Sequence, residues 1–82
     1  MTTSDLSASH YLGIYRLRLS MAEDGTTHPS AKGMKFMREF VVALATLSPD
    51  EPVRLEKTSQ CARFSCAKTG NLLAEVALAD QV

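Results

Sequence analysis

Residues 31–47, AKGMKFMREFVVALATL, carry apolar side chains at spacings of three and four. This spacing predicts an α-helix with one broad apolar face, because such steps return to the same side of a helix. Ser30 is the expected N-cap, and Pro49 ends the pattern because a proline cannot continue a helix. The apolar face comprises Met34, Met37, Phe40, Val41, Leu44 and Leu47. We expect a sheet or a partner protein to cover it.

The segment before this helix, residues 10–22 (HYLGIYRLRLSMA), alternates between apolar and polar residues from Tyr15 onward. A period of two predicts a half-buried strand, with Arg16 and Arg18 on the face turned away from the core. Residues 23–30 have the composition of a turn. Residues 1–9 are rich in serine and threonine, and we expect them to form a flexible segment outside a single domain of residues 10–82.

The segment after the helix reads as strands at residues 53–57 and 61–66, followed by a hairpin turn with positive φ at Gly70. The last run, residues 72–79, fits both a strand and a helix, and we favour the strand because a tight hairpin leads into it. The predicted class is therefore α+β, in the order β-α-β-β-β or with a helical last element. A single helix would pack on one face of a three- or four-stranded, mainly antiparallel sheet.

Composition limits the function. The 82 residues carry 9 Lys+Arg against 9 Asp+Glu, and a zero net charge excludes a histone-like nucleic-acid binder. Cys61 and Cys66 lack zinc-site spacing, and we expect reduced thiols on opposite faces of one strand, with no metal or cofactor. The chain shows no signal-peptide pattern and no run long enough to span a bilayer, so we expect a cytoplasmic protein. A domain this small often gains stability from a second subunit, which makes a homodimer our expectation.

The predicted strand register brings arginines together on the sheet face without a helix. Guanidinium groups bind carboxylates and phosphates with two hydrogen bonds, so this face is our first candidate for partner binding. The aromatics expected to be exposed, Tyr11 and Phe36, do not clearly lie on this face, which gives no support to base stacking. The alternative is a solvated face with cross-strand Arg–Glu pairs. The candidate residues are Arg16, Arg18, Arg54 and Arg63.

A second set of basic residues surrounds the start of the predicted helix. A helix N-terminus favours anions, so cations there suggest an anionic partner. The alternative is the solvated side of an amphipathic helix. The set comprises His28, Lys32, Lys35 and Arg38.

Residues for catalysis are few. His10 and His28 have no patterned nucleophile or carboxylate beside them, so we do not expect an enzyme. The expected function is a small regulatory protein that occupies the surface of a partner protein. Domains of this size are common among phage and mobile-element proteins, including inhibitors of CRISPR complexes. The alternative is a module that binds nucleic acid or phosphate through the arginines, and the β-α-β-β order favours neither function.

Overall fold

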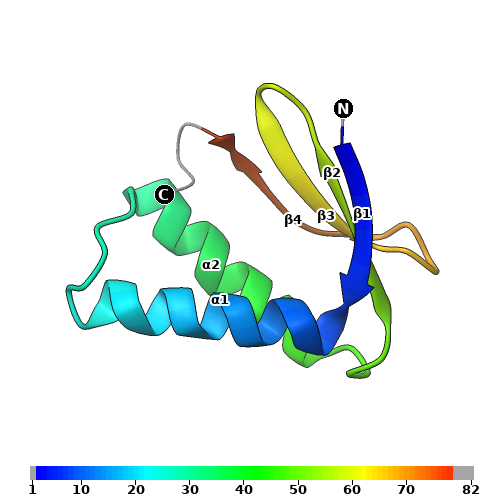
Figure 1. Cartoon of the computed structure of the whole chain (residues 1–82), viewed down its shortest axis with the longest axis horizontal. Helices are drawn as coiled ribbons and strands as arrows, with labels where there is room; N and C mark the ends of the chain where they lie inside the picture. The colour runs from blue at the N-terminus through cyan, green and yellow to red at the C-terminus, as the bar shows by residue number, and fades with distance from the viewer. Residues whose placement is uncertain (1, 79–82) are drawn as a thin grey trace.

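The computed structural model describes residues 2–78, with side chains from residue 5 onward, and places two helices on one face of a four-stranded sheet (Figure 1). All neighbouring strands are antiparallel, in the order β1-β2-β3-β4. The α+β class is confirmed, but the single helix is wrong, because a second helix replaces the first expected strand. The elements are β1 Thr2–Ser7, α1 Ala8–Glu23, α2 Ala31–Ala45, β2 Pro52–Lys57, β3 Cys61–Cys66 and β4 Leu72–Ala77.

Helix α1 occupies the segment expected to be a strand. Its first turn is capped by the Ser7 hydroxyl, which accepts a hydrogen bond of 3.3 Å from the backbone N–H of His10. Tyr11 and Tyr15, one turn apart, are buried, whereas Leu17 is 62% exposed. Apolar residues lie around much of this helix, so apolar side chains do not recur clearly every three to four residues. The apolar and polar residues alternate instead from Tyr15 onward, as they would in a strand. Leucine, methionine and arginine are also good helix formers.

Strand β1 was not expected, because residues 1–9 are mostly polar and we predicted them to be flexible. Instead, β1 pairs with β2 along its whole length, with Asp5 opposite Arg54 and Leu6 opposite Val53. A backbone hydrogen bond holds the junction between β1 and α1: the Ala8 N–H donates to the carbonyl oxygen of Glu51 at 2.8 Å. The pairing depends on backbone groups of β2 far along the chain, and the local sequence carries no sign of it.

The predictions for α2 and for the strands after it agree with the structure. Helix α2 begins after Ser30, whose hydroxyl accepts a hydrogen bond of 3.0 Å from the Gly33 N–H. Strands β2 and β3 form at the expected positions, and Gly70 turns the next hairpin with a φ of 77°. The run after this turn is strand β4 rather than a helix, and a register shift between Phe64 and Ser65 marks its pairing with β3.

The core contains every aromatic residue of the chain except the histidines. The closest ring pair is Phe40–Phe64, with centroids 4.4 Å apart, so α2 meets β3 directly. Tyr15 joins them from α1, 5.0 Å from Phe40. Tyr11 and Phe36, which we expected to be exposed, are buried in the same cluster. Aromatic burial therefore ties both helices to the sheet.

Candidate functional site

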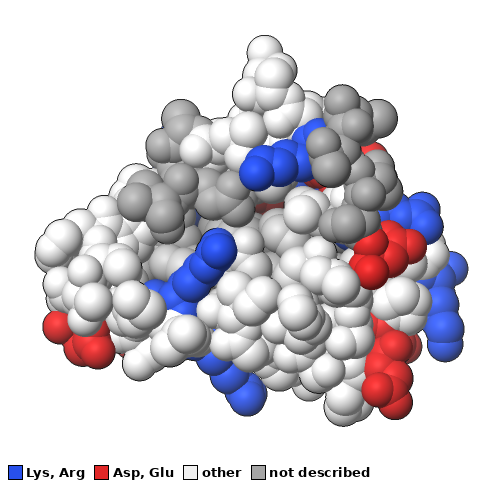
Figure 2. Space-filling view, in the orientation of Figure 1, with Lys and Arg blue, Asp and Glu red and all other residues white. Residues whose placement is uncertain are grey.

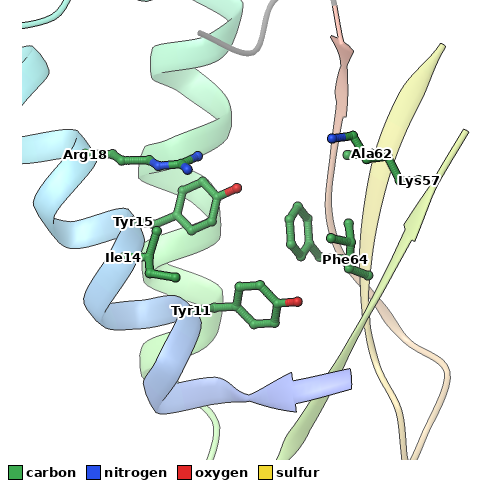
Figure 3. Close-up of a pocket in the computed structure, with 8 residues that line it drawn as sticks. Tyr11, Ile14, Tyr15, Arg18, Lys57, Ala62 and Phe64 are labelled. Atoms are coloured by element: carbon green, nitrogen blue, oxygen red, sulfur yellow. The ribbon is translucent and has the colours of Figure 1, made fainter. Parts of the chain in front are cut away.

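A hollow of about 390 Å³ lies between α1 and the strands β2 and β3 (Figure 3). We name it the tyrosine pocket, because both tyrosines of the chain line it. Its volume falls in the range of small-molecule sites, which is about 300–1,000 Å³. The lining residues are Tyr11, Ile14, Tyr15, Arg18, Leu55, Lys57, Ala62 and Phe64.

Helix α1 supplies one wall of the tyrosine pocket. Tyr11, Ile14, Tyr15 and Arg18 follow one another at steps of three, one and three residues, and these positions share one side of a helix. Figure 3 shows the two phenol rings reaching from α1 toward the sheet, with the Arg18 guanidinium beside Tyr15. The guanidinium carbon lies 5.0 Å from the centre of the Tyr15 ring, within cation–π distance.

The sheet supplies the facing wall. Leu55 and Lys57 are two positions apart on β2 and therefore point to the same face. Their partners on β3 are Phe64 and Ala62, respectively, so these four side chains form one block of the helix-facing surface. In Figure 3 the Lys57 amine extends toward the side of the pocket where Arg18 lies.

The described polar residues that line the tyrosine pocket carry positive charge without a matching negative charge. Two of its lining residues are cations, Arg18 and Lys57, and none of the described lining residues is a carboxylate. The Tyr11 hydroxyl oxygen is buried and has no hydrogen-bond partner among the described residues, in a side chain only 5% exposed. Burying a polar group without a hydrogen-bond partner costs roughly 1–3 kcal/mol of folding free energy. A hydrogen-bond acceptor placed beside this hydroxyl would therefore be favourable.

A second hollow, of about 450 Å³, opens on the other flank of Arg18. We name it the apolar hollow, because Arg18 is the one charged residue among the described residues that line it. Leu17 is largely exposed there. Ile14 and Arg18 border both hollows, which are therefore neighbours on α1. The lining residues are Ile14, Leu17, Arg18, Met21, Thr27 and Met37.

The four candidate arginines do not share one face. Arg54 and Arg63 lie on β2 and β3, on the sheet face without helices, as the register predicts. Arg16 and Arg18 lie on α1, because residues 10–22 are helical rather than extended. Arg18 points to the tyrosine pocket and Arg16 borders a different, smaller hollow near the end of α2. The predicted four-arginine surface is therefore wrong as an arrangement.

Carboxylates accompany both sheet arginines. Arg54 donates to Asp5 through Nε at 3.1 Å and Nη2 at 3.3 Å, and Arg63 Nε donates to Glu75 at 2.7 Å. These hydrogen bonds, and then the carboxylate charges, raise the pKa of both guanidinium groups. Glu56 lies opposite Arg63 and adds a further negative charge. This is the cross-strand pairing that we weighed as the alternative, and it pairs both arginines of this face with carboxylates.

The second basic set is dispersed. His28 lies in the loop before α2, and Lys32, Lys35 and Arg38 are exposed on the helix. Lys35 Nζ lies 3.9 Å from Glu39, an i,i+4 pair. Lys32 and Lys35 border a hollow that also contains carboxylates. Figure 2 likewise shows basic and acidic side chains scattered over the visible face.

Sequence reasoning missed Tyr11 and Lys57 as site residues. The available signal was the pair of tyrosines at i and i+4 with an arginine three positions further on, which forms one helical face. A strand assignment hides this face, because Tyr15 and Arg18 then point to opposite sides.

No family model, curated protein or solved structure matches this chain. Among residues 2–78, no three histidine, cysteine or acidic side chains gather as a metal site. No described helix has the length and apolar run that crossing a membrane requires.

Proposed function

We propose that this protein is a small, non-catalytic regulatory protein that occupies the surface of a partner protein and docks on it through the apolar hollow. The observation that carries this proposal is Leu17, which is 62% exposed in the middle of α1. Burying a leucine side chain contributes roughly 1.5–3 kcal/mol, so its exposure leaves that free energy available to an interface.

The surroundings of Leu17 suit a protein partner. Met21 and Met37 border the same hollow, and methionine side chains adapt readily to the shape of what they contact. A concave apolar centre that receives one or two anchoring side chains is the usual location of interface hot spots. The single charge, Arg18, would pair with a carboxylate of the partner. The expected partner segment therefore presents apolar side chains next to an acidic residue.

A matched pair of exposed leucines tests this function. Leu17 is 62% and Leu72 is 57% exposed, on α1 and on β4 respectively. Tagged wild-type protein, Leu17→Lys and Leu72→Lys are used to capture partners from a lysate of the source organism, with and without nuclease treatment. The captured partner is purified, and its affinity for each variant is measured by calorimetry.

We expect Leu17→Lys to weaken binding at least about tenfold, since it places a charge in an apolar contact. Leu72→Lys should bind like the wild type. Equal binding by both variants would exclude the apolar hollow as the docking surface. Capture that depends on nucleic acid would favour a nucleic-acid module instead.

A further inference from the structure

We propose that the tyrosine pocket binds a small aromatic carboxylate that carries a hydroxyl group at the end remote from its carboxylate. The pocket differs from the apolar hollow in chemistry, because it holds two cations, a buried donor and two tyrosine rings. This assignment does not rest on the proposed protein partner.

The charge of the pocket indicates an anion. Arg18 and Lys57 reach it from opposite walls, and neither makes an ion pair with a carboxylate in the described part of the chain. By contrast, Arg54 and Arg63 each have an acidic partner. Two cations without a carboxylate partner among the described residues, beside one concave surface, attract a single negative group, and a carboxylate can accept hydrogen bonds from both.

The remaining walls indicate an aromatic body. The half-buried Ile14 and Leu55 supply apolar contacts, and the ring of the buried Phe64 faces the pocket from β3 in Figure 3. Aromatic rings favour edge-to-face contacts with other rings, as Tyr11 and Phe64 already make at 5.3 Å and 81°. The aromatic lining therefore favours a ligand that contains an aromatic ring.

The Tyr11 hydroxyl requires a second polar group on the ligand. Its oxygen is buried, whereas the Lys57 side of the pocket is exposed to solvent. A carboxylate held near the solvent by Lys57 and Arg18 would direct the other end of the ligand inward. A hydroxyl oxygen at that end would accept a hydrogen bond from Tyr11 and satisfy the donor.

Four small probes separate these contributions. The first, para-hydroxyphenylacetate, has every feature of the proposed ligand. Phenylacetate lacks the hydroxyl, para-hydroxyphenylacetamide lacks the charge, and acetate lacks the ring. Binding to the wild-type protein is measured by calorimetry. Protein labelled with ¹³C-tyrosine locates it, since the chain has two tyrosines and both line the pocket.

We expect para-hydroxyphenylacetate to bind at millimolar concentration or below and to shift both tyrosine ring signals. The amide and phenylacetate should bind about fivefold to tenfold more weakly, and acetate should not shift the rings. Failure of para-hydroxyphenylacetate to bind, or equal binding of its amide, would overturn the assignment.

Protein variants provide the matching controls. Tyr11→Phe should weaken para-hydroxyphenylacetate about fivefold to tenfold but leave phenylacetate unchanged, because the lost hydrogen bond exists with the first ligand alone. Lys57→Gln should weaken both carboxylates, whereas Arg16→Gln, an exposed arginine of α1 outside the pocket, should weaken neither. An unchanged affinity in Lys57→Gln would contradict the site. Lys57 does not line the apolar hollow and Leu17 does not line the tyrosine pocket, so the two proposals fail independently.

Discussion

Arg54 and Asp5, which are 49 residues apart in the chain, form a two-pronged hydrogen-bonded ion pair across β1 and β2. We expected Arg54 to bind a partner, but it contacts Asp5 and so links β2 to the edge strand β1. β1 lacks an apolar pattern, and its register on β2 is set by a ladder of backbone pairs together with this contact of the Asp5 side chain.

The Arg54–Asp5 pair should contribute little to stability, because both side chains are partly solvated and salt screens them. In a double-mutant cycle of Asp5→Asn and Arg54→Gln, measured by urea unfolding, we expect a small favourable coupling. It should disappear in molar salt. A coupling as large as the loss caused by a core truncation would show that this pair is not a surface contact.

Two glycine substitutions should have opposite effects on stability. Gly13 lies within α1 with open space around its Cβ position, so Gly13→Ala should stabilise the protein by about 0.5–1 kcal/mol. Gly70 has a φ of 77°, so Gly70→Ala should destabilise it by about 1 kcal/mol. Thermal or urea unfolding measures both. A destabilising Gly13→Ala would argue against a helix at this position.

Two leucines of the helices should differ widely when truncated. Leu44 on α2 is 1% exposed and Leu17 on α1 is 62% exposed. Leu44→Ala should cost about 2–5 kcal/mol because it leaves a cavity in the core. Leu17→Ala should change the free energy of unfolding by no more than about 0.5 kcal/mol. Similar losses from the two variants would place Leu17 in the core, as the strand assignment of its segment predicted.

Removing the Tyr11 hydroxyl should stabilise the protein in the absence of ligand. The oxygen is buried and has no partner in the part of the chain that the structure describes, so Tyr11→Phe removes a desolvation penalty and keeps the ring contacts with Phe40 and Phe64. We expect a gain of up to about 1 kcal/mol in urea unfolding. A loss of stability would mean that the hydroxyl already has a partner in solution.

Cys66 should make stability depend on pH. Hydrogen bonds from the Thr69 hydroxyl and from the backbone N–H groups of Thr69 and Lys68 lower the pKa of this thiol from its ordinary value of 9.0. The folded protein therefore loses this proton at a lower pH than the unfolded chain does. The resulting stabilisation is fully present above the unfolded pKa, and it is lost as the pH falls through the folded pKa.

The measurement compares wild-type protein with Cys66→Ala by urea unfolding under reducing conditions, from about pH 6 to about pH 10. The difference in unfolding free energy should grow as the pH rises. Cys61→Ala, on the same strand, is the control. A difference that stays constant over this range would show that the thiol titrates alike in the folded and unfolded states.

The elements predicted correctly are those in which local chemistry and tertiary contacts agree. Helix α2 has a serine cap, an apolar face and a proline after it, and each signal lies within a few residues. The β3–β4 hairpin has Gly70 at the position that needs a positive φ. Such signals act through backbone sterics and short hydrogen bonds, so the sequence alone carries them.

The candidate site depended on the element that was predicted wrongly. Residues 15–21 alternate in polarity, yet they form a helix because Tyr11, Tyr15, Leu12 and Leu19 pack into the core with residues of α2 and the sheet. That packing separated Arg16 and Arg18 from Arg54 and Arg63. It also brought Arg18 near Lys57, from a strand about forty residues later in the chain.

The sequence by itself determined the α+β class, the capped helix α2, the strands β2 and β3 and their alternation of faces, because these follow from nearest-neighbour chemistry and side-chain period. The sequence of the last run fits both a strand and a helix, and its pairing with β3 makes it a strand. Only the tertiary structure decided that residues 8–23 are helical, that residues 2–7 form an edge strand, and which charges meet. The physical reason is that these outcomes depend on distant partners: aromatic rings on α2 and β3, backbone groups on β2, and carboxylates on neighbouring strands.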